Sequence, residues 1–179
     1  MNKKAKAPEG AAETQREDNK IALHLLKALY KEREKEKHPY FPDHARVVPA
    51  FSDSTANGLT KCVIEWLRLN GHQSERINTM GRPIDNRRTF TDVTGRTRQT
   101  GSVKWIPSGS QRGSADVSST IMGQSIKIEI KAGRDRQSEA QKQYQQQVEA
   151  AGGVYLIVRN FTEFLQWYDE FTKGGTNVR

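Results

Sequence analysis

The chain has 179 residues, a formal net charge of +8 and a mean hydropathy of −0.83. This length suits one domain with a tail, and the low hydropathy indicates that part of the chain is disordered. No apolar run approaches the ~20 residues of a membrane span, and the basic N-terminus lacks the apolar segment of a secretory signal. A single cysteine, Cys62, cannot form an internal disulfide. We therefore expect a cytoplasmic protein with no membrane partner.

The first third of the chain predicts a tail, a helix and a connector. Residues 1–18 lack apolar periodicity and are expected to be a disordered tail. Residues 19–50 are expected to form an N-terminal helix and its connector, and residues 51–179 the main domain. The helix begins near Ile21 and stops at His38-Pro39. Its apolar stripe is Leu23, Leu26 and Tyr30, and the extended connector carries Pro39, Pro42 and Pro49.

A second helix is predicted from Thr55 to Asn70-Gly71, a typical C-terminal stop. Its apolar stripe is Leu59, Val63, Trp66 and Leu67. Cys62 lies in this helix without a nearby second cysteine or histidine, so we expect it to be packed rather than catalytic. A short strand is predicted at residues 73–78, and residues 80–112 are interpreted as irregular strands and loops.

Basic residues concentrate in the middle of the chain. Residues 76–112 hold eight basic residues and only two acidic ones, which is +6 of the total charge. An arginine-rich stretch of this kind favours contact with a polyanion. We expect nucleic acid to contact Arg82, Arg87, Arg88, Arg96, Arg98, Lys104, Arg112 and, further on, Arg134 and Arg136.

The segment 113–131 predicts two short strands joined near Met122-Gly123. Residues two apart on a strand share a face, so Glu129 and Lys131 point one way and the isoleucines between 126 and 130 point the other. A two-residue loop pairs Asp116 with Glu129, and two opposed carboxylates call for a positive charge such as a divalent cation. A four-residue loop would pair Asp116 with Lys131 instead, and a three-residue loop would place Asp116 on the opposite face. An exposed, charged hairpin face is the alternative to a metal site.

The rest of the chain predicts a helix, a buried strand and a last helix. Ser138 caps the helix that runs to about Ala151, the strand is residues 154–158, and the last helix carries Phe164 and Trp167. The order of strands and helices indicates a mixed α/β sheet with the hairpin inside it.

Taken in order, these segments resemble the VRR-NUC nuclease family of the PD-(D/E)xK superfamily. The matching motifs are Gly113-Ser114-Ala115-Asp116, Ile128-Glu129-Ile130-Lys131, Gln137-Ser138-Glu139-Ala140-Gln141 and Ala151-Gly152-Gly153 before the buried strand. The resemblance is to the small stand-alone proteins of phages and bacteria. It implies a restriction-endonuclease-like fold, a mixed β-sheet flanked by helices.

The resemblance also implies roles for single residues. Asp116, Glu129 and the backbone carbonyl of Ile130 would bind Mg²⁺ or Mn²⁺. Lys131 would orient the attacking water or help to deprotonate it, and would stabilise charge on the phosphate. Gln141 would contact the metal-bound water or the substrate. Gln141 can equally complete a capping box with Ser138. The family usually carries an acid in the helix before the hairpin, where this chain has Asn57, with Asp53 before it and Glu65 after it.

These features predict a divalent-metal-dependent endonuclease that acts on DNA. The resemblance further implies a homodimer that selects branched DNA such as four-way junctions. The alternative is a DNA-binding protein that keeps the nuclease fold without efficient cleavage.

Overall fold

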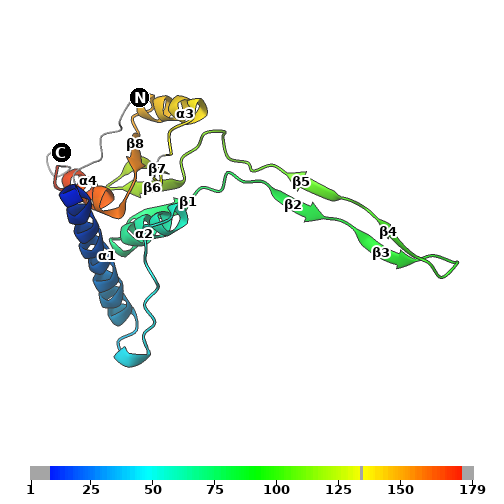
Figure 1. Ribbon diagram of the computed structural model, residues 1–179, viewed down its shortest axis with the longest axis horizontal. Coiled ribbons are helices and arrows are strands. Elements are labelled where there is room, and N and C mark those ends of the chain that lie inside the picture. Colours follow the sequence, from blue (N-terminus) through cyan, green and yellow to red (C-terminus); the bar gives the residue numbers. More distant parts are fainter. Residues whose placement is uncertain (1–8, 134, 175–179) are drawn as a thin grey trace.

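The computed structural model describes residues 9–133 and 135–174, which form a compact body and a long protruding arm (Figure 1). The body is built around a four-stranded sheet in the order β1 (Gln73–Arg76), β6 (Val117–Ile121), β7 (Gln124–Ile130) and β8 (Val154–Val158). β6 is antiparallel to both β1 and β7, whereas β8 is parallel to β7. A parallel neighbour needs a crossover connection, and α3 (Glu139–Ala150) provides it. The predicted mixed α/β sheet is confirmed.

The hydrophobic core lies on one face of this sheet. Ile126, Ile128 and Ile130 of β7 point into it and are buried. They pack with residues of α2 (Ala56–Leu69), α4 (Phe161–Gly174) and α1 (Glu9–Lys37), among them Leu26, Leu59, Leu67, Phe161 and Phe164. On the other face of the sheet, α3 packs against β8. The alternation along β7 thus leaves Glu129 and Lys131 on the α3 side, as expected from the sequence.

The second helix follows its sequence signals closely. Thr55 is the N-cap of α2, and its side chain accepts a hydrogen bond from the backbone N–H of Gly58. Asn70 is the C-cap, and Gly71 takes the left-handed conformation that favours glycine, with φ of 83°. Cys62 is buried, and burial raises the pKa of its thiol to about 11. The prediction that Cys62 is packed is confirmed.

The prediction of a disordered tail is wrong for residues 9–18, which form the first turns of α1. Residues 1–8 lie outside the described residues. The side chains of residues 14–18 are exposed, so this part of the helix has no apolar stripe to read. Its alanine, glutamate, glutamine and arginine residues nevertheless favour helix. At its other end α1 stops at Lys37, as predicted.

Ala22 and Leu26 of α1 belong to the same core as α2 and α4. Beyond α1 the connector contains one short 3₁₀ helix, η1 (Asp43–Ala45). The Arg46 side chain donates hydrogen bonds to the backbone carbonyls of Glu34, His38 and Phe41, and so fixes the connector to the end of α1.

Residues 80–112, interpreted as irregular strands and loops, do contain strands, but these are regular and form two successive antiparallel pairs. β2 (Arg82–Asp85) pairs with β5 (Val103–Ile106), and β3 (Arg88–Thr91) pairs with β4 (Thr97–Thr100). Together they make the arm, drawn in green at the right of Figure 1. Most arm residues are exposed on both faces. Without a buried face the sequence lacks the apolar alternation by which strands are recognised.

No α-helix within residues 9–133 and 135–174 combines the length and the apolar character that a bilayer crossing requires.

Candidate active site

The β6–β7 hairpin decides where the predicted acids lie. Met122 and Gly123 have φ angles of 50° and 83°, which is the pattern of a type I′ turn. Ile121 therefore pairs with Gln124, and the ladder continues to Val117 opposite Ile128. The two-residue loop is confirmed, and the three- and four-residue alternatives are wrong. The next step of the same register brings Asp116 to Glu129.

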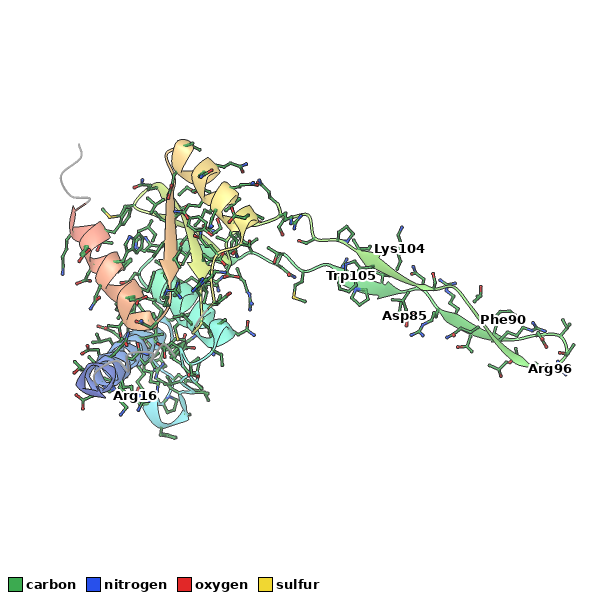
Figure 2. All side chains as sticks on the ribbon, turned by 45° about the horizontal axis from the view of Figure 1, so that its top comes forward. Arg16, Asp85, Phe90, Arg96, Lys104 and Trp105 are labelled. Carbon is green, nitrogen blue, oxygen red and sulfur yellow. The ribbon has the colours of Figure 1, made fainter. Side chains whose placement is uncertain are left out.

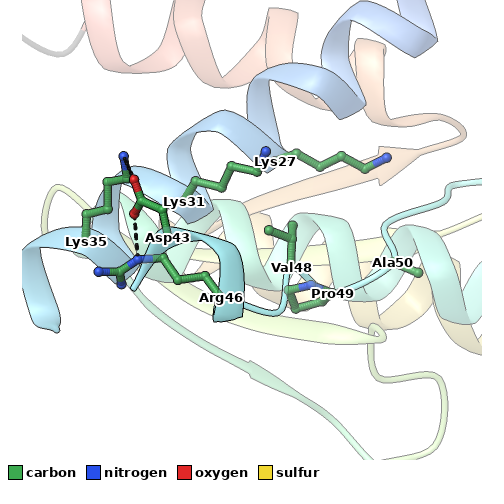
Figure 3. A pocket seen from close by; sticks show the side chains of 8 residues that line it. All are labelled: Lys27, Lys31, Lys35, Asp43, Arg46, Val48, Pro49 and Ala50. Atoms are coloured by element: carbon green, nitrogen blue, oxygen red, sulfur yellow. Dashed lines mark hydrogen bonds and ion pairs between the residues drawn. The ribbon is translucent and has the colours of Figure 1, made fainter. Parts of the chain in front are cut away.

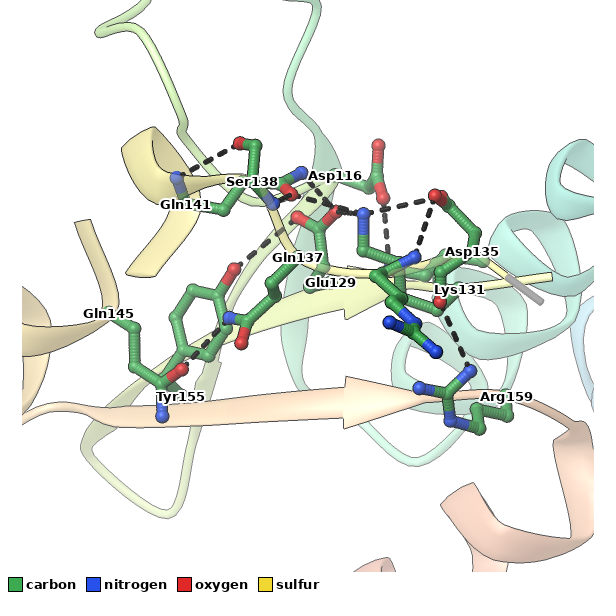
Figure 4. A network of polar contacts seen from close by, with 12 residues as sticks. Asp116, Glu129, Lys131, Asp135, Gln137, Ser138, Gln141, Gln145, Tyr155 and Arg159 are labelled. Carbon is green, nitrogen blue, oxygen red and sulfur yellow. Dashed lines mark hydrogen bonds and ion pairs between the residues drawn. The ribbon is translucent and has the colours of Figure 1, made fainter. Parts of the chain in front are cut away.

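Glu129 and Lys131 form a buried ion pair on the α3 side of the sheet (Figure 4). The Lys131 Nζ lies 3.0 Å from the Glu129 Oε1, and the two side chains are only 5% and 3% exposed. Charged side chains are almost never buried to this degree unless they are paired. The pair is therefore held apart from solvent by the strand and by α3.

Asp116 stands across from this pair, just before β6. Its Oδ2 accepts a hydrogen bond of 2.9 Å from the backbone N–H of Ile130, and its own carbonyl accepts one of 2.8 Å from Ile77. The first bond joins the Asp116 carboxylate to β7, and the second joins its backbone to the end of β1, so the position of the carboxylate is fixed. The second carboxylate oxygen makes no hydrogen bond within the described part of the chain, and Asp116 is only half-buried. That oxygen is available to a ligand.

Gln141 connects the acid and the lysine with α3. Its backbone N–H and side chain complete a capping box with Ser138. The same side chain reaches the ion pair: Oε1 accepts from Lys131 Nζ at 3.1 Å, and Nε2 donates to Glu129 Oε1. The capping box predicted for Gln141 is confirmed, and the same amide group also holds the buried pair. Its contact with a metal-bound water or with substrate stays a prediction.

Two further residues complete the cluster, and neither was singled out from the sequence. The Tyr155 hydroxyl donates to Glu129 Oε2 at 3.4 Å, and an oxygen of Asp135 lies 3.3 Å from Lys131 Nζ. Tyr155 stands opposite Lys127 in the parallel β7–β8 ladder, so it shares the face of Glu129. Only the register of a parallel pair reveals this neighbour. Asp135 lies in the loop after β7, where a spacing of four residues from Lys131 predicts no contact, so no sequence pattern marked it.

Burial and neighbouring charges shift the pKa values in the cluster. Burial raises the pKa of Glu129, and the nearby Asp116 carboxylate adds to the rise, while Lys131 and Tyr155 oppose it. Burial tends to lower the pKa of Lys131, but the hydrogen bonds and charges of Glu129 and Asp135 prevail and raise it. Burial and the Glu129 charge also raise the pKa of Tyr155. Lys131 is therefore a cation and Tyr155 a neutral donor at neutral pH.

The oxygen atoms here suit a hard divalent cation. Asp116 offers its free oxygen, and Glu129 and the Ile130 carbonyl stand beside it on β7. Mg²⁺ is typically bound through one or two carboxylates and keeps several waters. The described residues contain no group of three or more His, Cys, Asp and Glu side chains arranged for a metal ion. A site with two carboxylates and a backbone carbonyl would not depend on such a group.

No upstream acid joins the cluster by a hydrogen bond in the described part of the chain. Asn57 lies in the first turn of α2, and its Oδ1 accepts a 2.7 Å bond from Arg76 at the end of β1. Asp53 instead accepts from the first backbone N–H of α4 at 3.1 Å. Burial and the charge of Glu34 raise the pKa of the Tyr30 hydroxyl on α1, and the charge of Glu65 adds to the rise. Asp53 thus serves to hold the start of α4.

The predicted nucleic-acid residues separate into two groups. Arg112 lies on the segment that returns from the arm toward Asp116, and Arg136 follows Asp135 next to the ion pair. Arg134 lies outside the described residues. The other six stand on the arm, namely Arg82, Arg87, Arg88, Arg96, Arg98 and Lys104.

A cavity of about 570 Å³ lies away from this cluster, between α1 and the connector (Figure 3). Lys27, Lys31, Lys35 and Arg46 line it together with Asp43, Val48, Pro49 and Ala50. Asp43 forms ion pairs with Lys35 at 2.8 Å and with Arg46 at 3.0 Å. Arg46 is also tied to three carbonyls, so the polar groups on this side of the cavity serve to hold the connector in place.

No protein-family model matches the chain, and no curated protein is significantly similar to it. The assignment of a function therefore depends on the chemistry of the cluster around Glu129.

Proposed function

We propose that the chain is a divalent-metal-dependent endonuclease that hydrolyses phosphodiester bonds in DNA. The observation that carries the proposal is the buried Glu129–Lys131 pair with Asp116 across from it at the end of the same hairpin. Desolvated charges whose pKa values are shifted by burial and by each other are typical of functional sites. The mixed sheet with helices on both faces also agrees with the restriction-endonuclease-like fold that the sequence resemblance implies.

In this proposal Asp116, Glu129 and the Ile130 carbonyl hold Mg²⁺ or Mn²⁺. The bound ion would supply positive charge for the phosphate oxygens. Asp116 is pre-positioned by its bond to the Ile130 N–H, so little rearrangement of the chain is needed on binding. Lys131 stays protonated and is aimed by Glu129, Asp135 and Gln141. Its charge would orient the attacking water and stabilise the negative charge that develops on the phosphate.

One observation favours the alternative, a DNA-binding protein of this fold without efficient cleavage. Both oxygens of Glu129 already accept hydrogen bonds, Oε1 from Lys131 and Gln141 and Oε2 from Tyr155. Burial also raises the pKa of Glu129, which weakens it as a ligand. A cation would have to share these oxygens with their present donors.

Cleavage assays with site variants distinguish the two functions. The protein is incubated with linear, flapped and four-way-junction DNA in Mg²⁺, in Mn²⁺ and in EDTA. We expect cleavage with either metal and none in EDTA. Asp116→Asn and Lys131→Ala should lower the cleavage rate by about 100-fold or more, because each removes a charge needed at the reacting phosphate, while DNA binding in EDTA persists.

Two exposed residues provide matched controls. Lys142→Ala changes a lysine on α3 that pairs with Glu139, and Asp169→Asn changes an aspartate on α4. Both variants should cleave like the unmodified protein. Cleavage that survives in both Asp116→Asn and Lys131→Ala would show that the active site lies elsewhere. A pure protein that binds all three DNAs but cleaves none with either metal would establish the alternative. Preference among the three DNAs would test the selectivity for branched DNA, and sedimentation would test the homodimer.

A further inference from the structure

The arm carries apolar side chains that nothing in the described part of the chain covers. Its strands pair only with one another. Phe90, Val103 and Trp105 are 49%, 48% and 58% exposed. Figure 2 shows Phe90 and Trp105 on the arm, away from the body. A lone two-stranded hairpin is marginally stable in water and usually needs another surface. The arm therefore has the character of a binding element.

The charge of the arm indicates what kind of surface it binds. Residues 78–110 hold six basic and two acidic residues, a net charge of +4. Both acidic residues form ion pairs within the arm, Asp85 with Arg87 and Asp92 with Arg98. The other four basic residues are exposed and have no ion pair within the described residues: Arg82, Arg88, Arg96 and Lys104. Residues 113–179 hold as many acidic as basic residues, so this part of a second copy of the chain offers the arm no net negative charge.

Cations and apolar groups alternate along single faces of the arm. Residues directly opposed in an antiparallel pair share a face. Arg82 faces Ile106, and Ile84 faces Lys104, which places two cations and two isoleucines together. On the distal pair Phe90 faces Arg98. Basic groups interleaved with apolar and aromatic ones can meet phosphates and base edges at once.

The base of the arm is fixed beside the candidate active site. The hydroxyls of Ser108 and Ser110 each donate a 2.6 Å hydrogen bond to the carbonyl of Asn78, which clamps the two sides of the base together. The preceding residue, Ile77, donates its N–H to the carbonyl of Asp116. A duplex lying along the arm would therefore lead toward Asp116.

We propose that the arm lies in the major groove of a B-form DNA duplex next to the cleavage site. A two-stranded ribbon fits that groove. At about 3.3 Å per residue, the ten or so residues of one side of the arm span about 35 Å, which is about one turn of B-form DNA. An A-form RNA duplex has a deep, narrow major groove that excludes such a ribbon. This inference deepens the proposed function, on which it rests for the cleavage site.

The salt dependence of duplex binding tests the arm separately from cleavage. Binding of the full chain to a duplex of about 30 base pairs, roughly three turns, is measured in EDTA between about 50 and 200 mM salt. The slope of log K against log salt is negative, and in the triple variant Arg88→Ala/Arg96→Ala/Lys104→Ala it should be less negative by about 2.7, since each lost phosphate contact removes about 0.9. The matched control Lys20→Ala/Lys27→Ala/Lys31→Ala changes three exposed cations of α1 and should leave the slope unchanged.

Two further measurements define the duplex. Shortening the DNA from about 30 to about 10 base pairs should weaken binding of the unmodified protein at least tenfold and bring it close to that of the arm variant. A matched RNA duplex should show no difference between the variant and the unmodified protein. Equal loss on DNA and RNA duplexes would overturn the placement in the major groove.

An unchanged salt slope in the triple variant would overturn the proposal as a whole. The proposal would also be overturned if Phe90→Ser/Trp105→Ser converted a dimer into a monomer while the salt slope of DNA binding stayed the same. The arm would then join two copies of the chain. If no cleavage is found but the slope still depends on the arm, the nuclease proposal alone fails. If cleavage occurs but the arm variant cleaves and binds as before, the arm proposal alone fails.

Discussion

Removing the charge of Lys131 alone should destabilise the protein strongly. In Lys131→Met the Glu129 carboxylate stays buried without its cation, and breaking such a buried pair costs about 3–5 kcal/mol. That is a large part of the roughly 5–15 kcal/mol by which a domain is stable. With a urea m-value of about 2 kcal/mol per molar, the unfolding midpoint should fall by about 2 M.

Removing both charges should restore most of this stability. In Glu129→Gln/Lys131→Met the amide can still bond to Gln141 and Tyr155, and replacing a buried ion pair by neutral groups is often neutral or stabilising. We expect the double variant to lie within about 1 kcal/mol of the unmodified protein or above it. It should nevertheless cleave no DNA. Such a result would mean that the ion pair contributes little to stability and is needed for cleavage.

The pH dependence of the stability of Lys131→Met provides a second test of the cost of the unpaired Glu129 carboxylate. Burial raises the pKa of Glu129 in the folded chain above its unfolded value, and loss of the cation raises it further. A raised carboxyl pKa gives stability at low pH that is lost as the pH rises through the folded value. The defect of Lys131→Met should therefore be smaller at acid pH than at neutral pH. Equilibrium urea unfolding at several pH values measures this. The reasoning would be refuted if each single variant lost less than about 1 kcal/mol of unfolding free energy and the two losses added up in the double variant.

Four smaller changes test other contacts. Ser138→Ala removes a helix cap and should lower the free energy of unfolding by about 1 kcal/mol, but leave cleavage intact. Gln141→Ala should lower it by a similar amount and also slow cleavage about 10- to 100-fold. Equal cleavage rates of the two variants would mean that Gln141 serves only as a cap. Met122→Asn should raise the free energy of unfolding by about 0.5–1 kcal/mol, because asparagine tolerates the left-handed turn position better. Burial lowers the pKa of His72, which contacts the Tyr168 hydroxyl at 2.8 Å, so the folded protein should lose stability as the pH falls below 6.5. His72→Gln should weaken that pH dependence, and identical unfolding curves of both proteins across this range would contradict the assignment.

Local sequence rules predicted those parts of the fold whose signals are local. Thr55 and Asn70-Gly71 bound the second helix because caps act within a turn of the chain. The alternation from Ile126 to Ile130 set the faces of β7, and with them the common side of Glu129 and Lys131. Local rules failed in α1 before residue 19 and in the arm, where exposed side chains leave no apolar periodicity to read.

The sequence by itself determined which residues stand at the hairpin, namely Asp116, Glu129 and Lys131, and which pair caps the helix after it, namely Ser138 and Gln141. It left the loop length open, because methionine is an unusual first residue of a primed turn. Tertiary structure settled the two-residue loop, brought Gln141 and Tyr155 onto Glu129 across α3 and β8, and projected the cations of residues 82–104 away from the body. Such contacts depend on the register of a parallel pair and on helix packing, which join residues far apart in the chain.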